Sequence, residues 1–280
     1  MKKITRRSFL AAAGLTAAAL ALTACGGSSS STASSAASSA AASSEAASSS
    51  AAAAELTTVE AGKLTMATNA AFPPYEMTTD AGDFEGIDIE TAQAIADKRG
   101  LELQIDDMDF DAALLSVQQG KADIVMAGVT VTDERKAVMD FSDSYATGIQ
   151  SIIVPEGSDI ASPDDLAGKK IGTQRGTTGY IYCSDDFGDE NVVAYDDGLT
   201  AVQALNNGQV DAVVIDNAPA KEFIAANPGL VILETSYAEE DYAIGLAKGS
   251  SLEDAINSAL EELKADGTLQ SIVDKYISAE

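Results

Sequence analysis

A short stretch from Ala127 to Arg135 (A-G-V-T-V-T-D-E-R) gathers side chains that suit the binding of a small anion. Gly128 lets a ligand approach the backbone closely, and Thr130 supplies a hydroxyl group. Arg135 carries a rigid guanidinium fork that matches a carboxylate through two parallel hydrogen bonds. The stretch therefore predicts a receptor for a molecule that bears an anion. The alternative is a strand followed by an ordinary helix cap and a surface arginine.

A similar pattern of residues occurs twice along the chain, at a constant offset of 88 residues. Residues 116–128 align with residues 204–216, so that Gly120 falls on Gly208. In both copies the apolar spacing predicts a helix, the glycine predicts a turn, and a run of apolar residues predicts a buried strand. Two such units at this separation predict an α/β protein with two similar lobes of roughly 100 residues each.

The predicted strand of the first copy ends at Gly128, and that of the second copy ends at Asp216. Open α/β sheets bind ligands beyond the carboxyl ends of their strands. One lobe then offers a guanidinium and hydroxyl groups while the other offers a carboxylate, which is the charge pattern needed to hold a zwitterion. For Asp216 the alternative is a helix cap before Ala218 and Pro219.

The elements that must position these groups begin with a strand predicted over residues 62–68. In the segment 69–76 (N-A-A-F-P-P-Y-E), two adjacent prolines predict an extended loop that holds Phe72 at the end of this strand. The ring would stack on a ligand or pack in the core. Residues 86–100 follow as an amphipathic helix ended by its last glycine. Phe110 precedes the next helix and is free to face either the core or the cleft.

The first 25 residues predict an export signal, because a basic start is followed by an apolar Ala/Leu stretch and a small-residue site. Residues 5–10 resemble the twin-arginine signal, and residues 22–25 (L-T-A-C) resemble the bacterial lipobox, which leaves the export route open. Residues 26–55 are almost entirely Ser and Ala and predict a disordered tether. We therefore expect an exported protein that is lipid-anchored through Cys25 to the outer face of the cytoplasmic membrane.

Charge and composition exclude several classes of function. The chain has 17 basic and 44 acidic residues, and removal of the segment before Cys25 takes away four basic residues and no acidic one, which leaves a net charge of −31. Such a charge repels nucleic acid over long distances. The sequence has no histidine, and Cys183 is the sole cysteine after Cys25, so Ser-His and Cys-His nucleophiles, His-based zinc sites and an intrachain disulfide are excluded. No catalytic residue, metal or cofactor is expected.

Several motifs follow one another in the order and spacing of the family-3 extracellular solute-binding proteins. They are N-A-A-F-P-P-Y-E (69–76), G-I-D-I-E (86–90), M-D-F-D-A-A-L-L-S-V-Q-Q-G-K-A-D (108–123), A-G-V-T-V-T-D-E-R (127–135), D-F-S-D-S-Y (140–145), V-D-A-V-V-I-D (210–216) and Y-A-I-G-L-A-K-G (242–249). The similarity covers essentially everything from Lys63 onward. The chain resembles the substrate-binding lipoprotein of an amino-acid ABC importer.

This resemblance implies a periplasmic-binding-protein-like type II fold, in which two similar α/β lobes are joined by a two-crossing hinge with the ligand cleft between them. The crossings are expected at residues 148–155 and near residues 236–241. Lobe 1 then consists of residues 56–147 plus 240–280, and lobe 2 of residues 148–239. The protein is expected to be a monomer that delivers an amino-acid ligand to the ABC permease subunits in the membrane.

The resemblance also implies roles for individual residues. Phe72 and Phe110 would form opposite walls of the ligand site, and Gln174 would approach the ligand side chain. Asp216 would hold the α-ammonium group. The α-carboxylate would be held by Ala127, Gly128, Thr130, Arg135, Thr177 and Thr178.

Asn69 stands where many members of this family carry aspartate. A neutral amide offers donors and an acceptor without net charge, whereas a cationic side chain in a partly dry pocket needs a carboxylate. We therefore expect a ligand-binding role for Asn69 and a polar or neutral amino acid rather than arginine or lysine. Glu76 or Asp109 would supply such a carboxylate if either faced the cleft, which the sequence leaves open.

Two other classes of protein have the same fold. An extracytoplasmic sensor module would show the same sequence features. The periplasmic cyclohexadienyl dehydratases need a general acid in the cleft, and this chain offers carboxylates such as Glu76, Asp109 and Asp216 but no histidine and no paired-carboxylate motif. The residues therefore favour a binding protein over an enzyme.

Overall fold

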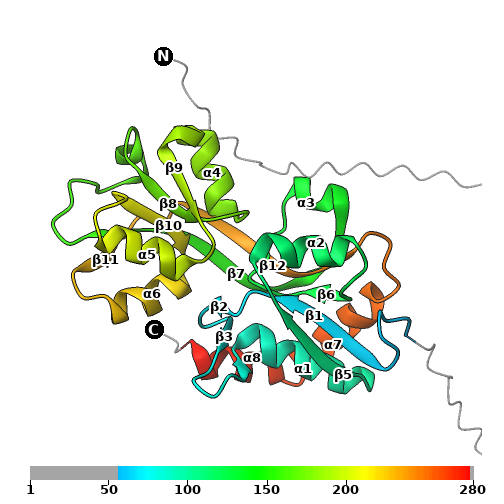
Figure 1. Cartoon of the computed structure of the whole chain (residues 1–280). Coiled ribbons are helices and arrows are strands. Elements are labelled where there is room, and N and C mark those ends of the chain that lie inside the picture. Colours follow the sequence, from blue (N-terminus) through cyan, green and yellow to red (C-terminus); the bar gives the residue numbers. More distant parts are fainter. Residues whose placement is uncertain (1–55, 278–280) are drawn as a thin grey trace, which may run out of the picture. The chain divides into compact units, whose positions relative to one another are not determined.

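The computed structural model describes residues 56–277, which belong to one compact unit. This unit has the mixed α/β fold that the sequence predicts, with a nine-stranded sheet, a separate three-stranded sheet and helices around them (Figure 1). The signal peptide, the lipidation site Cys25 and the tether lie outside the described residues. Among the residues that are described, no helix is long and apolar enough to cross a membrane.

The large sheet consists of two parallel segments joined by antiparallel strands. Its members are β1 (Lys63–Thr68), β5 (Glu102–Asp107), β6 (Ile124–Val125), β7 (Met139–Pro155), β8 (Ile171–Gln174), β9 (Val192–Tyr195), β10 (Ala212–Asp216), β11 (Leu230–Ile232) and β12 (Ala238–Ala247). The order is β5-β1-β6-β12-β7-β10-β8-β9, and β11 pairs with β7 outside this path. β1 runs parallel to β5 and β6, and β8 runs parallel to β9 and β10. β7 and β12 pair antiparallel and connect the two parallel segments.

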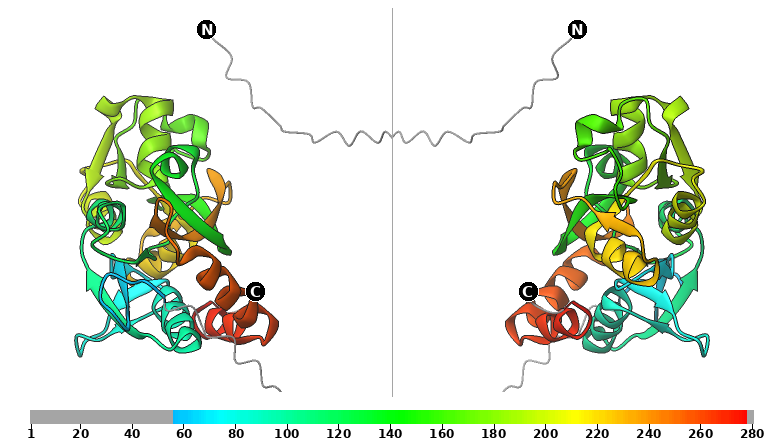
Figure 2. Two further views of the ribbon diagram at one scale, coloured as in Figure 1. Left: turned by 90° about the vertical axis from the view of Figure 1, so that its right-hand side faces the viewer. Right: turned by 90° about the vertical axis from the view of Figure 1, so that its left-hand side faces the viewer.

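The helices gather near the two ends of β7 (Figure 1). At one end, beside β1, β5 and β6, are α1 (Ile87–Arg99), α2 (Phe110–Gln118), α3 (Asp133–Val138), α7 (Glu253–Ala265) and α8 (Thr268–Tyr276). At the other end, beside β8, β9 and β10, are α4 (Thr178–Phe187), α5 (Gly198–Asn206) and α6 (Asn217–Ala226), with two short 3-10 helices at Pro163–Leu166 and Asp189–Asn191. Figure 2 shows α7 and α8, coloured orange to red, packed against α1.

The first helix agrees with its prediction. Gly100 ends α1 in the left-handed conformation, with a φ of 68°, and its N–H group bonds to carbonyl groups of the last turn. Four of its apolar residues, Ile89, Ala92, Ile95 and Ala96, are buried in the core, and so are the polar Asp88 and Thr91.

The two copies of the sequence repeat have the same structure. In each copy a helix (α2 or α5) leads through a glycine with a φ of 66° or 67° into a strand (β6 or β10). After each glycine, an aspartate at the start of the new strand accepts a hydrogen bond from the backbone of the neighbouring parallel segment. Asp123 accepts a hydrogen bond from the N–H of Thr65 at 2.8 Å, and Asp211 accepts one from the N–H of Lys170 at 2.7 Å. The structure therefore confirms the predicted order of helix, turn and strand in both copies.

The segment after β1 differs from the prediction. In place of an extended loop, the short strands β2 (Ala71–Phe72) and β3 (Glu76–Thr78) form an antiparallel hairpin, which β4 (Phe84–Glu85) extends to the three-stranded sheet. The N–H of Tyr75 donates to the carbonyl of Phe72 at 3.0 Å and closes a turn that contains both prolines. The two prolines thus lie in a reversal of the chain, and Phe72 faces Glu76 across the hairpin.

Candidate functional site

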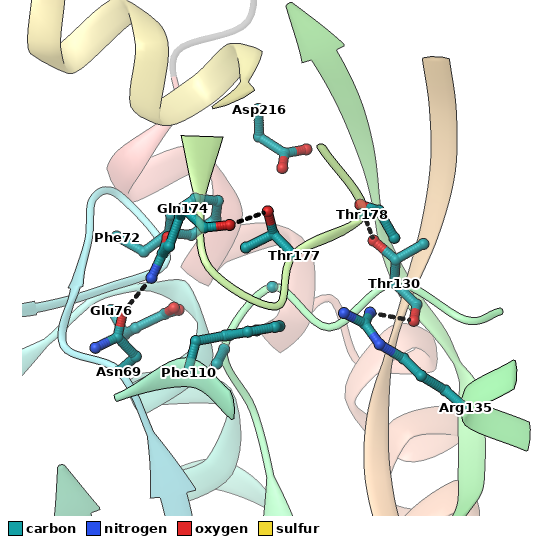
Figure 3. A pocket seen from close by; sticks show the side chains of 12 residues that line it. Asn69, Phe72, Glu76, Phe110, Thr130, Arg135, Gln174, Thr177, Thr178 and Asp216 are labelled. Carbon is teal, nitrogen blue, oxygen red and sulfur yellow. Dashed lines mark hydrogen bonds between the residues drawn. The ribbon is translucent and has the colours of Figure 1, made fainter. Parts of the chain in front are cut away.

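All the residues that the sequence assigns to ligand binding lie around one cavity (Figure 3). The volume of this cavity is about 20 Å³, which is room for about one water molecule. Glu76, whose direction the sequence left open, lines the cavity as well. The predicted residues in its wall are Asn69, Phe72, Phe110, Ala127, Gly128, Thr130, Arg135, Gln174, Thr177, Thr178 and Asp216.

Two strands approach the cavity from opposite directions. β6 is antiparallel to β12, β12 to β7, and β7 to β10, so β6 and β10 run in opposite directions within the sheet. Gly128 follows the carboxyl end of β6, Asp216 ends β10, and both line the cavity. The cavity therefore lies beyond the carboxyl ends of both strands, where α/β sheets bind ligands.

Arg135 is only 8% exposed, so the alternative of a surface arginine is wrong. Its Nη1 donates to the carbonyl of Thr130 at 2.7 Å, and its Nη2 donates to the carbonyl of Gly176 at 3.2 Å. The helix cap of α3 is Thr132, whose side chain accepts from the N–H of Arg135. Because a guanidinium has five N–H donors, these bonds leave donors for a ligand.

Thr130 and Thr178 lie at the same end of the cavity as Arg135 (Figure 3). Their hydroxyl oxygens are 3.4 Å apart, and both hydroxyls donate to Oε2 of Glu240, at 3.1 and 2.9 Å. A hydroxyl has one proton, so each of these groups presents lone pairs to its remaining surroundings. In this arrangement the donors for an anion are the guanidinium of Arg135 and nearby backbone N–H groups, rather than the two hydroxyls.

Helix α4 begins beside this group of side chains. Thr177 caps the helix, because its Oγ1 accepts from the N–H of Tyr180 at 3.3 Å and donates to the carbonyl of Gln174 at 2.8 Å. The first N–H groups of a helix have no partner within the helix and stabilise an anion. The helix terminus and Arg135 therefore favour negative charge at the same end of the cavity.

Asp216 occupies the N-cap position of α6, but its side chain makes no capping hydrogen bond. Its Oδ2 accepts from Nε2 of Gln150 at 2.7 Å, while its buried Oδ1 has no hydrogen-bond partner among residues 56–277. Burial raises the pKa of Asp216 to about 7. A carboxyl group in this environment would be stabilised in its ionised form by a cation, which is the chemistry required to bind an ammonium group.

Two aromatic rings, Phe72 and Phe110, form walls of the cavity and are 7% and 5% exposed. Each also belongs to a cluster of buried apolar residues, so both rings serve the core as well as the cavity. Gly128 lies against Phe72 with a φ of +55°, and a Cβ at this position would come within 2.8 Å of the ring. Glycine is therefore required where the ring meets the backbone.

Asn69 and Glu76 lie at the end of the cavity opposite Arg135 (Figure 3). Nδ2 of Asn69 donates to the carbonyl of Met108 at 3.0 Å, and its Oδ1 accepts from Nε2 of Gln174 at 2.8 Å. Both ends of the Asn69 amide thus have partners within the protein. Asp109, the other carboxylate considered from the sequence, is exposed and does not line the cavity.

Of three further polar residues in this region, the sequence left the direction of Glu76 open and did not indicate Gln150 or Glu240. Glu76 lies opposite Phe72 in the hairpin, and directly opposite residues of an antiparallel pair share a face, so a predicted hairpin would have placed it in the cavity. Gln150 and Glu240 come from β7 and β12, and Nε2 of Gln150 donates to Glu240 at 3.2 Å. The only feature of the sequence that points to Gln150 and Glu240 is that each is a polar residue within a strand. Among residues 56–277, no group of three or more His, Cys, Asp or Glu side chains is arranged to hold a metal ion.

The sequence similarity to known proteins includes every residue that lines the cavity. The family model for the bacterial extracellular solute-binding proteins, family 3, matches residues 64–279. The L-cystine-binding protein TcyJ of Escherichia coli (strain K12) is 32% identical over 226 residues, which cover 79% of this chain and 85% of that protein. The arginine-binding extracellular protein ArtP of Bacillus subtilis (strain 168) is 32% identical over 228 residues, which cover 78% of this chain and 87% of that protein.

Solved structures of an ancestral arginine-binding protein have the same fold. The form bound to arginine has a TM-score of 0.74 and 42% identity, and the match covers 78% of this chain and 99% of that chain. The form bound to glutamine has a TM-score of 0.74 and 41% identity, with the same coverage. The matched proteins bind solutes and are not enzymes. The chain therefore belongs to the bacterial extracellular solute-binding proteins of family 3, as an amino-acid-binding component of an ABC transporter.

Proposed function

We propose that this protein is the extracytoplasmic substrate-binding lipoprotein of an ABC importer, which binds a small amino acid and delivers it to a membrane permease. The observation that carries the proposal is the presence of Arg135 and Asp216, with opposite charges, in the wall of one cavity. An amino acid bears a carboxylate and an ammonium group on the same carbon, and the cavity offers a partner for each. The names of the relatives, which bind cystine or arginine, support the same class of ligand.

The α-carboxylate would accept hydrogen bonds from the remaining donors of Arg135 and from the N–H groups at the start of α4. The α-ammonium would donate to Oδ1 of Asp216, which has no other hydrogen-bond partner in the described part of the chain. Hydrogen bonds between ionised partners are about twice as strong as neutral ones. Both ends of the ligand backbone would therefore be held by charged side chains.

Ligand access requires the cavity to widen, because about 20 Å³ is far too small for an amino acid. We infer two lobes, residues 56–147 plus 240–280 and residues 148–239, that separate by bending where β7 and β12 cross between them. The gathering of the helices near the two ends of β7 supports this division (Figure 1). Hydrogen bonds between the lobes that opening would break include those of Asn69 with Gln174, Arg135 with Gly176, and Thr178 with Glu240.

From the sequence, the side chain of the ligand was expected to be polar or neutral, because Asn69 is uncharged. In the structure Asn69 uses both ends of its amide within the protein, so it has less capacity to recognise a neutral side chain. Glu76 is the other polar group at this end of the cavity, and the carboxyl group of Asp88 lies within hydrogen-bonding reach of it. The charge state of Glu76 therefore determines which amino-acid side chains the cavity binds best.

The membrane anchor in this proposal is Cys25, followed by the tether of residues 26–55, both outside the described residues. The lipid would hold the protein at the outer face of the cytoplasmic membrane, and the protein would act as a monomer beside its permease. The lipobox and the Ser/Ala composition of the tether support this part of the proposal.

A thermal-shift screen of the twenty amino acids tests the binding function. A ligand that binds only the folded state raises the free energy of unfolding by about 2.7 kcal/mol at about a hundred times its Kd. At least one amino acid should raise the melting temperature of the wild-type protein. Arg135→Gln should abolish this shift, and Arg175→Gln, at an exposed arginine, should preserve it. The absence of a shift with every amino acid would contradict the proposal.

A further inference from the structure

Glu240 is a buried carboxylate on which hydrogen-bond donors from separate segments of the chain converge. Its side chain is 8% exposed. Oε2 of Glu240 accepts from the hydroxyl of Thr130 at 3.1 Å, from the hydroxyl of Thr178 at 2.9 Å and from Nε2 of Gln150 at 3.2 Å. Buried charges are normally paired or hydrogen-bonded, because an isolated buried charge is very costly, and these donors meet that requirement.

The donors come from both of the lobes inferred above. Thr130 belongs to residues 56–147 of lobe 1, whereas Thr178 is the first residue of α4 in lobe 2, and the two lie together at one end of the cavity (Figure 3). Tyr182, one turn further along α4, is also within hydrogen-bonding reach of Glu240. Glu240 itself lies on β12, where this strand crosses between the lobes. One carboxylate therefore connects the two lobes at the crossing.

Gln150 extends these contacts to the other end of the ligand site. It lies on β7 two residues beyond Gly148, which is opposite Glu240 in the sheet, and side chains two residues apart in a strand share a face. Gln150 is also directly opposite Asp216 of β10, and its Nε2 donates to Oδ2 of Asp216 at 2.7 Å. A continuous chain of hydrogen bonds thus runs from the carboxylate expected to bind the ligand ammonium to the two threonines.

The charge of Glu240 also acts on Arg135. Burial lowers the pKa of the Arg135 guanidinium, and the negative charge of Glu240 opposes this shift. Arg135 bonds to the carbonyls of Thr130 and Gly176, which belong to different inferred lobes. Groups of the chain alone therefore supply both hydrogen bonds and a counter-charge for this buried guanidinium when the lobes meet.

We propose that Glu240 is a positioning residue that holds the two lobes together at the crossing: its carboxylate binds the hydroxyls of Thr130 and Thr178 and the amide of Gln150, and so stabilises the closed cavity with or without a ligand. This inference rests on the proposed function, because it concerns closure of the same cavity. Hydrogen bonds to an ionised group are about twice as strong as those between neutral groups, so removal of the charge should weaken all three contacts together.

Energy transfer between dyes on the two lobes measures closure of the whole chain. In a Cys25→Ser background, Leu115→Cys on α2 and Leu199→Cys on α5 place labels at exposed positions of different lobes, and the thiol of Cys183 is buried. The protein without ligand should populate a closed state, and Glu240→Gln should lower this population at least about threefold. Saturating L-glutamine or L-arginine should close both proteins.

Stopped-flow binding of L-glutamine and L-arginine gives a second readout. A bound amino acid leaves through the open state, so Glu240→Gln should raise its dissociation rate at least about fivefold and leave the association rate constant within about threefold. A general loss of stability would not produce this pattern, because only folded molecules bind. Retained binding also shows that the variant is folded.

The matched control is Glu239→Gln, the same substitution at the preceding residue, which is exposed on β12. It should leave the closed population unchanged. At the other end of the contact, Thr178→Val removes the hydroxyl and should lower the closed population without ligand, whereas Thr178→Ser retains the hydroxyl and should preserve that population.

Three results would overturn the inference while the proposed function stands. They are the absence of a closed population in the wild type without ligand, an unchanged closed population in Glu240→Gln, and an equal loss in Glu239→Gln. If Glu240→Gln does not fold, an unchanged closed population in Thr178→Val overturns the inference in the same way. Failure of all twenty amino acids to bind the wild type would instead contradict the proposed function.

Discussion

Oδ1 of Asn69 accepts a hydrogen bond of 2.8 Å from Nε2 of Gln174, which lies 105 positions away in the sequence. Nδ2 of Asn69 donates at the same time to the carbonyl of Met108. The amide therefore joins two distant parts of the chain across the cavity. Only a side chain with both a donor and an acceptor can make this connection, so the neutral residue at position 69 has a structural use that is independent of the ligand.

Asn69→Asp should lower the stability of the ligand-free protein. An ionised aspartate accepts from Gln174 but cannot donate to the carbonyl of Met108, which is left facing a negative charge. An unsatisfied buried polar group costs about 1–3 kcal/mol. Denaturant unfolding should detect this loss. The matched control is Asn207→Asp at an exposed asparagine, which should change the free energy of unfolding by less than about 0.5 kcal/mol. Equal effects at the two positions would contradict the structural role of Asn69.

Arg135→Ala should cost about 3–5 kcal/mol of ligand affinity, the range for breaking a buried charge pair. The ligand carboxylate would then be desolvated in the closed cavity without its cation. Because Arg135 also bonds to carbonyl groups of Thr130 and Gly176, a moderate loss of stability should accompany the loss of affinity. Calorimetry separates the two effects, and Arg175→Ala serves as the exposed control. An affinity for Arg135→Ala within about threefold of wild type would remove Arg135 from the site.

The sequence predicted the parts of the site that local pattern determines. The glycine turns of the repeat, the strand before Gly128 and the extent of helix α1 each follow from residue types that are close together in the chain. Arg135 and Asp216 were predicted as a pair because both follow strands of the repeat. The structure places these two residues in the wall of the same cavity.

The parts that were missed depend on contacts between distant segments. Glu76 was left undecided because one reversal of the chain, between β2 and β3, decides which way it faces. The partners of Asn69 and the position of Glu240 beside Thr130 and Thr178 arise where separate strands and helices meet. No local sequence pattern predicts such contacts, because each of these polar side chains could equally well lie on the protein surface.

Ligand affinity should depend on pH through Asp216. Its pKa is raised to about 7 by burial in the empty protein, and a bound ammonium group favours the ionised form. For a neutral ligand such as glutamine, affinity should therefore fall by up to tenfold per pH unit below about pH 7 and level off above it. Asp216→Asn should weaken binding and remove this dependence. A pH profile of glutamine affinity that is the same in the variant and the wild type would contradict the role of Asp216.

Cys25→Ser should release the protein from membranes without changing its ligand affinity. A single acyl chain anchors a protein only marginally, so stable attachment implies more than one chain on this cysteine. Cell fractionation measures the attachment, and calorimetry on the released protein measures the affinity. The control is Cys183→Ser, because Cys183 is a buried free thiol that should have no part in anchoring. Membrane attachment of Cys25→Ser after signal cleavage would contradict a lipid anchor at this position.

The stability of the ligand-free protein should fall as the pH rises from about 4 to about 7. Burial raises the pKa of Asp88 to about 6, that of Asp216 to about 7, and that of Glu76 well above its usual range. In this window the folded state binds more protons than the unfolded state, so the free energy of unfolding decreases with increasing pH. The stabilisation is complete below the unfolded pKa of about 4 and is lost as the pH passes the folded values.

General repulsion among the many acidic residues acts in the same direction, so this prediction needs a variant to separate the two causes. Glu76→Gln combined with Asp216→Asn removes two buried titrations and leaves Asp88 and the acidic surface residues unchanged. Thermal unfolding between about pH 4 and pH 8 should show a shallower decline for the double variant than for the wild type. Saturating ligand should also reduce the slope in the wild type, because its ammonium group supplies the missing counter-charge for Asp216. A decline of the same steepness in both proteins would assign the effect to surface charge and not to the cavity.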